Sequence, residues 1–418
     1  MAGTAKVRTS MQAPLGKATS RFERKREAIL DAATVLLNRH GVKGLTLGDV
    51  AAAVDLSTTS VTYYFRRKDE LAGACMLRGI AALDAMVERA LAEPTPQDRL
   101  KLLLDLYMER LRQSLAGEAP PLPELADLRA LNPPVLGQVF AAFMKLFRHL
   151  RQIFDAPELQ WLSRGRQTAR THLLLEQLFW SGAWLLKYDL EDYPRIRDRT
   201  FEILVGGLAA PGAEWRPAPI AMSDIEPPGR KDKGRETFLV AATKLINARG
   251  YRGASVDKIS AALQVTKGSF YHHNDAKDDL VVSCFERSFE IMRRVQRLAM
   301  DLPGDEWTRI CSAAAALCEF QLSERGPLLR MSALSAVPEP IRMQMVLQSA
   351  RVSDRFAAMI SDGIAEGSLR PVDPFIAAQM LNATLNAGAE LAFWVPGIKP
   401  KAAPAIFARP LLMGLFEP

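Results

Sequence analysis

Residues 26–75 read REAILDAATVLLNRHGVKGLTLGDVAAAVDLSTTSVTYYFRRKDELAGAC, and residues 235–284 read RETFLVAATKLINARGYRGASVDKISAALQVTKGSFYHHNDAKDDLVVSC. Aligned at an offset of 209 without a gap, the two stretches share 17 identical residues in 50. Unrelated sequences share far fewer, so the segment occurs twice. Because the whole chain has 418 residues, twice 209, the repeat predicts two complete halves and not one duplicated motif.

Both copies predict the same succession of helices. Apolar residues recur at helical spacing over residues 29–37 in the first copy and 238–246 in the second, which indicates one buried stripe on a helix. Gly41 and Gly250 follow directly, where a left-handed residue commonly ends a helix. Each copy therefore begins with a supporting helix that ends at its glycine.

Two shorter helices follow in each copy. Thr46 and Ser255 are residues that cap helix N-termini, and so are Ser57 and Thr266, which come after a short turn. Two short helices joined by a tight turn behind a longer helix form a helix-turn-helix. A fourth, longer helix is expected to begin near Lys68 or Lys277.

The third helix has the composition of a DNA-reading helix. It must present small or polar side chains, because the major groove that it enters is about 12 Å wide. Val61 and Phe270 are the expected inward residues. The outward candidates are Thr58, Thr59, Thr62 and Tyr63 in copy one, and Lys267, Gly268, Tyr271 and His272 in copy two. An ordinary helical hairpin with a polar face is the alternative for either copy, and finding the pattern twice disfavours it.

Each copy resembles the DNA-binding domain of the TetR family of bacterial transcriptional regulators. The family pattern near the third helix is roughly Lys-Gly-Ser-hydrophobic-Tyr-x-His-Phe. Residues 267–273 fit it, but Asn274 stands where the family has a core Phe. The first copy keeps that Phe as Phe65 and has Thr58 and Thr59 in place of Lys-Gly. The resemblance covers about 100 residues and implies a helical fold and DNA binding.

The resemblance also implies roles for single residues. Helix N-termini and a nearby Lys would contact phosphates, which set the register on DNA, whereas base edges set the sequence. The implied phosphate contacts are Thr46, Tyr64, Lys68, Ser255, Tyr271, His273 and Lys277. The implied base-reading residues are Thr58, Thr59, Thr62, Tyr63, Lys267, Gly268 and His272, and the caps Ser57 and Thr266 complete the predicted DNA-binding set.

Positive charge is concentrated in the two predicted DNA-binding regions. Residues 1–71 carry 12 Lys or Arg against 7 Asp or Glu, and residues 229–280 carry 10 against 6. The chain as a whole has a net charge of +7, so the remaining residues are slightly acidic. This segregation is typical of a protein that binds nucleic acid.

The expected organisation is all-α, with two tandem TetR-like halves. A ligand and dimerisation domain follows each helix-turn-helix. Residues 166–209 and 375–416, the last helices of each half, would pack together within one chain, as the resemblance implies. The predicted units are a basic arm at 1–21, DNA-binding domains at 22–71 and 230–280, helical domains at 72–210 and 281–418, and a linker at 211–229. The arm either reaches a minor groove or is unstructured.

A small-molecule effector would be held by apolar and aromatic side chains. The candidate lining residues are Phe140, Phe143, Met144, Phe147, Phe179 and Trp180 in the first half, and Met343, Met359, Met380, Phe393 and Trp394 in the second. Plain core packing is the alternative for both sets. Cys311 and Cys318 are seven residues apart on one helical face, where they could sense an oxidant or a soft metal, and buried packing is the favoured interpretation. No third residue with metal-ligand spacing accompanies these cysteines, so no metal or cofactor is expected.

Other classes of protein lack support in the sequence. No Gly-x-Gly-x-x-Gly, phosphate-binding loop, His-Glu-x-x-His or nucleophile elbow occurs, so we do not expect an enzyme. No apolar stretch is long enough to span a bilayer, no secretory signal is visible, and four cysteines fit a reducing cytoplasm.

The sequence therefore predicts a cytoplasmic, ligand-responsive transcriptional regulator, with repression favoured. One chain would act as a pseudo-dimer on an operator with unlike half-sites, and pairing of whole chains stays open. Two alternatives remain: only the second copy reads DNA and two chains associate, or the fold is a helical interaction module that does not bind DNA.

Overall fold

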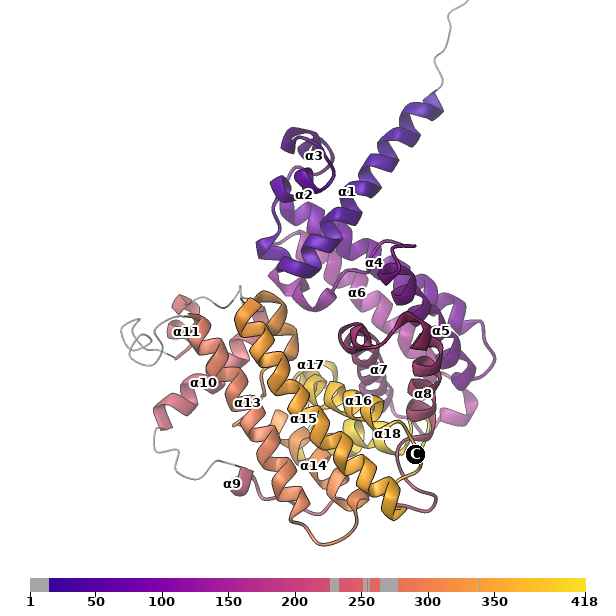
Figure 1. Cartoon of the computed structure of the whole chain (residues 1–418), viewed down its shortest axis with the longest axis vertical. Helices are drawn as coiled ribbons and strands as arrows, with labels where there is room; N and C mark the ends of the chain where they lie inside the picture. The colour runs from indigo at the N-terminus through magenta and orange to yellow at the C-terminus, as the bar shows by residue number, and fades with distance from the viewer. Residues whose placement is uncertain (1–14, 226–232, 251–253, 255, 264–276, 338) are drawn as a thin grey trace, which may run out of the picture.

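The computed structural model describes residues 15–225, 233–250, 254, 256–263, 277–337 and 339–418 (Figure 1). Over these residues the chain is helical, and its one β-type pairing is an isolated bridge between Ala209 and Leu369. The predicted all-α fold is confirmed.

The first half contains eight α-helices and several short 3-10 turns. They are α1 (Leu15–Gly44), α2 (Leu47–Ala53), α3 (Thr58–Tyr64), α4 (Lys68–Leu91), α5 (Pro96–Leu115), η1 (Leu125–Ala130), α6 (Val135–Arg151), η2 (Gln152–Phe154), η3 (Pro157–Leu159), α7 (Arg164–Trp184), η4 (Leu185–Lys187), η5 (Leu190–Asp192) and α8 (Tyr193–Gly206).

The second half repeats this order over its described residues. Its elements are α9 (Met222–Ile225), α10 (Lys233–Arg249), α11 (Val256–Leu263), α13 (Lys277–Met300), α14 (Glu306–Gln321), η6 (Met331–Ala336), α15 (Glu339–Glu366), α16 (Pro374–Ala387), η7 (Gly388–Glu390), α17 (Leu391–Trp394), η8 (Pro400–Ala402), η9 (Pro404–Ala408) and α18 (Arg409–Met413).

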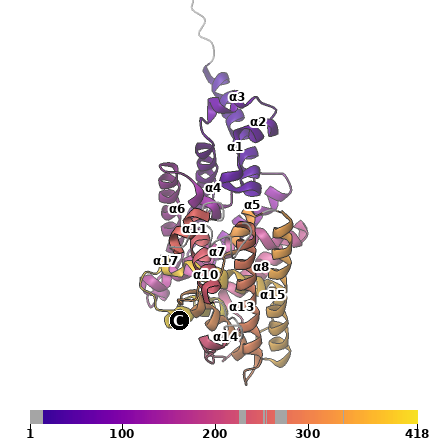
Figure 2. The same ribbon diagram turned by 90° about the vertical axis from the view of Figure 1, so that its left-hand side faces the viewer.

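Residues 15–21 differ from the prediction, because helix α1 begins at Leu15. The last seven residues of the predicted basic arm at 1–21 therefore belong to α1, Arg21 among them. In Figure 2, α1, α2 and α3 form a projection at one end of the molecule. The remaining part of the predicted arm lies outside the described residues.

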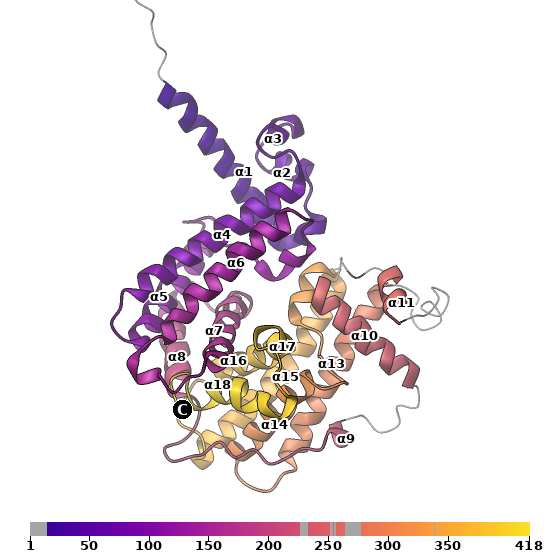
Figure 3. The same ribbon diagram turned by 180° about the vertical axis from the view of Figure 1, so that it is seen from behind.

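The two halves meet along their last helices. Helix α7 packs against α16, and α8 packs against α16 and α18. In Figure 3 these helices lie between α4–α6 of the first half and α13–α15 of the second. In the buried contact, Gln177 donates hydrogen bonds of 2.9 Å to the carbonyl of Met380 and to the hydroxyl of Thr384. These are the segments that the sequence assigned to the contact between halves.

The ends of the last helices exchange backbone hydrogen bonds. The amide of Leu208 donates to the carbonyl of Leu412, and the amide of Leu415 donates to the carbonyl of Leu204, both at 2.8 Å. Beside them, a Cβ on Gly207 would lie 2.4 Å from the carbonyl oxygen of Leu412. The pairing is reciprocal, as expected of two related units about a pseudo-twofold axis.

The linker between the halves is packed on the second half. The indole of Trp307 donates to the carbonyl of Glu214 at 2.9 Å, and the amide of Ala218 donates to the hydroxyl of Ser312 at 2.8 Å. Arg325 donates to the carbonyl of Met222 at 3.0 Å. The described part of the linker, up to residue 225, therefore follows a defined path along α14.

Candidate nucleic-acid interface

The first helix-turn-helix is built by local capping. Gly41 has a φ of 65° and interrupts α1, as expected of a residue without a Cβ. The hydroxyl of Thr46 accepts the amide of Asp49 at 3.1 Å and begins α2. The hydroxyl of Ser57 accepts the amide of Ser60 at 3.1 Å and begins α3. The caps of both helices are thus those predicted from the sequence.

Helix α3 has one buried face and one exposed face. Val61 is fully buried, and Phe65 packs into the same core just after the helix. Thr58, Thr59 and Thr62 are exposed, and 76% of Tyr63 is accessible to solvent. The predicted inward and outward orientations are confirmed for this copy, so the polar face of α3 is free to enter a groove.

Tyr64 packs against the N-terminal part of helix α1. Its ring lies 4.7 Å from the ring of Phe22 on α1 and is half-buried, while Tyr63 lies edge-on to both rings. The three rings join the end of α3 to the projecting part of α1. Tyr64 therefore helps to position helix α3, and the phosphate contact predicted for it stays a prediction.

Lys68 is held by the protein. Its ammonium donates to the carbonyl of Lys43 at 2.9 Å, which satisfies a carbonyl group at the end of α1. Arg66 and Arg67, between α3 and α4, are the exposed cations at this position. Neither arginine is in the DNA-binding set predicted from the sequence, although the run of three cations at 66–68 is visible there.

The fourth helix is fastened to the first in the same way in both halves. Arg78 pairs with Glu27 at 2.9 Å, and Arg287, 209 positions later, pairs with Glu236 at 2.6 Å. The second DNA-binding unit also has Gly250 at φ 70° and Ile259 buried. The equivalent contacts show that the repeat extends to the tertiary structure.

Most predicted DNA-binding residues of the second copy lie outside the described residues. These are Ser255, Thr266, Lys267, Gly268, Tyr271, His272 and His273. Lys277 is described as the first residue of α13.

Comparison with known proteins gives the same assignment. The sequence model of the bacterial regulatory proteins of the tetR family matches the chain twice, at residues 29–75 and 238–284. The chain is a tandem TetR-like regulator. The two matches cover the helix-turn-helix of each half, at the offset of 209 found within the sequence itself.

Single relatives match only part of this TetR-like chain. The transposon Tn10 TetC protein of Escherichia coli is 22% identical over 159 residues, which cover 36% of this chain and 80% of TetC. The repressor DhaR of Mycobacterium sp. (strain GP1) is 27% identical over 139 residues, covering 32% of this chain and 70% of DhaR. Because 36% of this chain corresponds to 80% of TetC, and 32% to 70% of DhaR, the chain is a little over twice as long as either relative.

Among solved structures, the TetR family regulator PfmR of Thermus thermophilus is 19% identical. The match covers 43% of this chain and 98% of PfmR, with a TM-score of 0.36.

The candidate effector residues of the TetR-like halves come together at the contact between them. Phe147 of α6 stacks on Trp394 of α17, with ring centroids 3.8 Å apart and planes inclined by 12°. Phe143 also contacts Trp394, and Phe140 lies 6.3 Å from Phe393. Aromatic residues from both predicted sets therefore form one cluster that spans both halves.

The other candidates are distributed differently. Met359 and Met380 are buried, and Met144, Phe179 and Trp180 are partly buried against the core. Met343 is a correction to the predicted lining, because 63% of it is exposed on α15. It lies on the solvent-facing side of α15, where apolar residues also occur, so the apolar pattern alone did not distinguish the exposed side from the buried side.

Charged residues beside the aromatic cluster connect the halves. Arg129 of η1 and Arg330 both pair with Glu390 at 2.5 Å, and Arg330 also pairs with Glu176 at 3.2 Å. Burial raises the pKa of Glu390, but the two guanidinium groups outweigh it and hold that pKa below its usual value. Arg129 also donates to the carbonyl of Asn247 at 3.3 Å, so this network reaches the end of α10.

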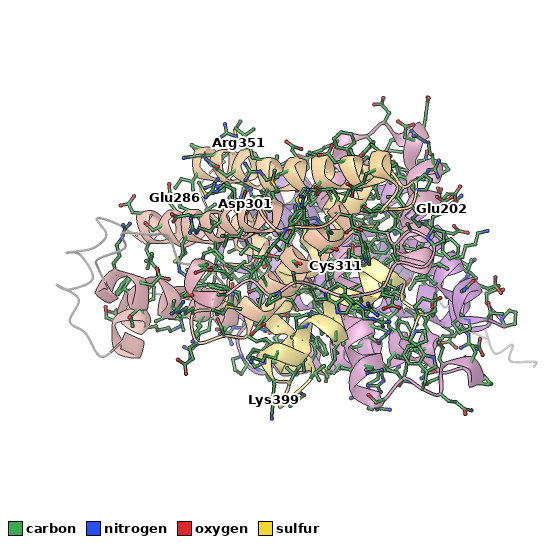
Figure 4. The ribbon with its side chains drawn as sticks, turned by 90° about the horizontal axis from the view of Figure 1, so that it is seen from below. Glu202, Glu286, Asp301, Cys311, Arg351 and Lys399 are labelled. Atoms are coloured by element: carbon green, nitrogen blue, oxygen red, sulfur yellow. The ribbon has the colours of Figure 1, made fainter. Side chains whose placement is uncertain are left out.

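The cysteines and possible metal ligands show no reactive arrangement among the described residues. Cys75, Cys284, Cys311 and Cys318 are buried and unpaired, and burial raises the pKa of Cys318 to about 12. Cys311 lies in the interior in Figure 4. No group of three or more metal-binding side chains occurs in this part of the chain, and none of its helices is long and apolar enough to cross a membrane.

Proposed function

We propose that one chain acts as a single-chain pseudo-dimer that represses transcription from an operator with two unlike half-sites. The reciprocal backbone hydrogen bonds between Leu208 and Leu412, and between Leu415 and Leu204, carry this proposal. An interface of this kind uses the same surface on both units, as in a twofold dimer. Repression is supported by the similarity to DhaR, which is named a transcriptional repressor.

Crossed contacts support the same arrangement. Helix α1 of the first half lies against η6 of the second, and α10 of the second half lies against η1 of the first. Each DNA-binding unit is therefore supported by both halves. Such support would hold two reading helices at one spacing, as binding to two half-sites requires.

The half-sites are expected to differ because the reading helices differ. From Ser57 and Thr266 to Phe65 and Asn274, only Ser60 and Ser269 are identical in nine aligned positions. Threonine methyl groups suit thymine methyl groups, whereas a lysine suits guanine. The first helix-turn-helix would thus favour base steps that contain T, and the second would favour steps that contain G.

Selection of binding sites from random DNA tests the proposal. We expect enrichment of a site with two unlike halves, and sedimentation of the complex with one chain per site. Enrichment of a perfect palindrome bound by two chains would contradict the pseudo-dimer. It would favour the alternative in which only one helix-turn-helix of each chain reads DNA. Binding that does not weaken as salt rises would contradict specific DNA recognition altogether, because phosphate contacts release counterions.

We further propose a small, largely apolar effector at the aromatic cluster, and a cytoplasmic location where operator DNA is accessible. The indole nitrogen of Trp394 and Nδ1 of His172 are buried without hydrogen-bond partners among the described residues. Their rings lie 5.6 Å apart, so a ligand with one polar group could use both. Quenching of tryptophan fluorescence by a screened compound, lost in Trp394→Phe, would support this site, whereas unchanged quenching would place the effector elsewhere.

A further inference from the structure

Four arginines lie on facing turns of α13 and α15. Arg293 and Arg297 are on α13, and Arg351 and Arg355 are on α15. The two helices are packed directly together, because Gln296 donates to the carbonyl of Val352 at 2.9 Å. In Figure 4, the labelled Arg351 lies at the outer side of α15. The arginines therefore form one surface, which we name the arginine patch.

The first half has opposite charges at the equivalent positions. The offset of 209 that relates α4 to α13 pairs Asp84 with Arg293 and Glu88 with Arg297. An offset of 206 relates α6 to α15, since it superposes buried Leu146 on buried Val352.

The first-half surface is neutralised by ion pairs. At the 206 offset, Lys145 and His149 correspond to Arg351 and Arg355. Asp84 contacts His149 at 2.7 Å and Lys145 at 3.8 Å across the two helices. In the second half both carboxylates are replaced by arginines, so all four equivalent positions carry arginine.

Among the described residues, none of the four arginines of the patch makes an ion pair with a carboxylate. Burial lowers the pKa of Arg293, and Arg297, Arg355 and Arg351 lower it further, while Glu290 opposes them. Nη1 of Arg355 is buried and has no hydrogen-bond partner among the described residues. Arg293 donates only to a neutral group, the side-chain carbonyl of Gln348, at 2.7 Å. A bound anion would offset this repulsion between the guanidinium groups.

We propose that the arginine patch binds a compact polyanion, namely the diphosphate group of a small molecule. Arginine forks bind phosphate oxygens in pairs, and a diphosphate places several negative charges in a small volume. Residues four apart on one helix lie about 6 Å apart, so the four guanidinium groups can converge on one such group.

Operator DNA does not fit this position. Arg293 is 16 residues beyond Lys277, the start of α13 beside the second DNA-binding unit. At about 1.5 Å per residue the patch lies about 24 Å along the helix from that end. A diphosphate bound there would instead bridge α13 to α15, and so act on the helix that leads to the second reading head only.

Titration of the full chain with inorganic pyrophosphate, followed by calorimetry, tests the site. We expect saturable binding with one site per chain, because the first half has carboxylates at the equivalent positions. The double variant Arg293→Asp with Arg297→Glu restores the first-half residues and allows ion pairs with Arg351 and Arg355. We expect its affinity for pyrophosphate to fall by about tenfold or more, with thermal stability retained or raised.

The control is Lys399→Glu, which reverses an exposed charge at a different part of the surface (Figure 4). It should leave binding unchanged. Parallel titrations with ADP and with orthophosphate separate a nucleotide-linked diphosphate from a single phosphate.

Three results would overturn the proposal. The first is that binding of pyrophosphate does not saturate, and the second is that the double variant binds it with the same affinity as the wild-type chain. The third is that orthophosphate and sulfate bind as tightly as pyrophosphate at matched ionic strength. Saturable binding of an acidic peptide in place of pyrophosphate would identify a protein partner and would likewise reject the diphosphate. All outcomes are read without DNA, so they are independent of the operator selection that tests the proposed function.

Discussion

Asn38 and Asn247, 209 positions apart, make the same two hydrogen bonds in the two halves. The amide of Asn38 donates to the carbonyl of Leu122, and its carbonyl accepts the amide of Glu124, both at 2.8 Å. Asn247 bonds Leu328 and Arg330 in the same way, at 2.9 and 3.0 Å. Each asparagine fastens the supporting helix of a DNA-binding unit to the helical domain of its own half.

Replacing one asparagine should loosen one DNA-binding unit from the rest of its half. Asn38→Ala leaves the carbonyl of Leu122 and the amide of Glu124 without their partner, at a cost of about 1–3 kcal/mol. We expect weaker DNA binding through the first half-site only, and Asn247→Ala should affect the second half-site only. Binding measured on operators with one altered half-site distinguishes the two variants. Equal effects of both variants on one half-site would contradict the assignment of each DNA-binding unit to its own half-site.

The two glycines at the contact between halves should resist substitution. Gly207 and Gly414 have φ of 63° and 113°, and a Cβ on either would lie 2.4 Å from a backbone oxygen of the other half. We expect Gly207→Ala or Gly414→Ala to lower the free energy of unfolding by about 1–3 kcal/mol or more. Thermal unfolding measures this loss.

Gly117→Ala is the matched control for these variants. It has a φ of 73° but no atom within 4 Å of the added Cβ, so it carries the conformational cost without the clash. A loss in Gly117→Ala as large as in Gly207→Ala would show that the close approach between halves is unimportant.

Tyr63 should contribute more to DNA binding than to folding. Because 76% of the residue is exposed, Tyr63→Ala should lower stability only through its edge contacts with Phe22 and Tyr64, by about 1 kcal/mol. Discrimination at the contacted bases should fall by about 1–3 kcal/mol. Fluorescence anisotropy with labelled operator measures the affinity, and Phe375→Ala, which removes another exposed ring, is the control. Unchanged DNA affinity would remove Tyr63 from the reading surface.

Arg129 belongs to the first half but should stabilise the DNA-binding unit of the second half. Arg129→Ala removes the ion pair with Glu390 and the hydrogen bond to the carbonyl of Asn247. We expect a loss of about 1–3 kcal/mol in stability and weaker binding to the second half-site. Hydrogen exchange should show faster exchange at the end of α10. If exchange increases in α1 instead, the crossed coupling is wrong.

His172 should make the contact between halves sensitive to acid. Its Nε2 donates to the carbonyl of Ala387 at 3.0 Å, and burial lowers its pKa although Glu176 and Glu390 act in the opposite direction. The unfolded state, with a pKa of about 6.5, therefore binds more protons in mild acid, and stability falls as the pH drops below about 6.5.

His172→Gln keeps an N–H donor and removes this titration. We expect its melting temperature to vary less between about pH 7.5 and pH 5.5, where the unfolded imidazole gains its proton. The wild-type chain should lose stability over the same interval. Parallel curves for the two proteins would exclude His172 as the titrating group.

The helices and their ends were predictable because local chemistry decides them. Thr46 and Ser57 cap helices with their own hydroxyl groups, and Gly41 adopts a conformation that other residues rarely take. Val61 faces inward because the period of a helix sets its face. The position of Lys68 was less predictable, since its partner, the carbonyl of Lys43, is 25 residues away.

The sequence by itself determined that the chain contains two related halves and that each begins with a helix-turn-helix. The tertiary structure decided how they combine: Phe147 on Trp394, Arg129 with Glu390, and the exchange of hydrogen bonds at Leu208 and Leu415. Capping and periodicity act over a few residues and leave a local pattern. These contacts between halves join residues more than 200 positions apart, and no local pattern specifies which of them meet.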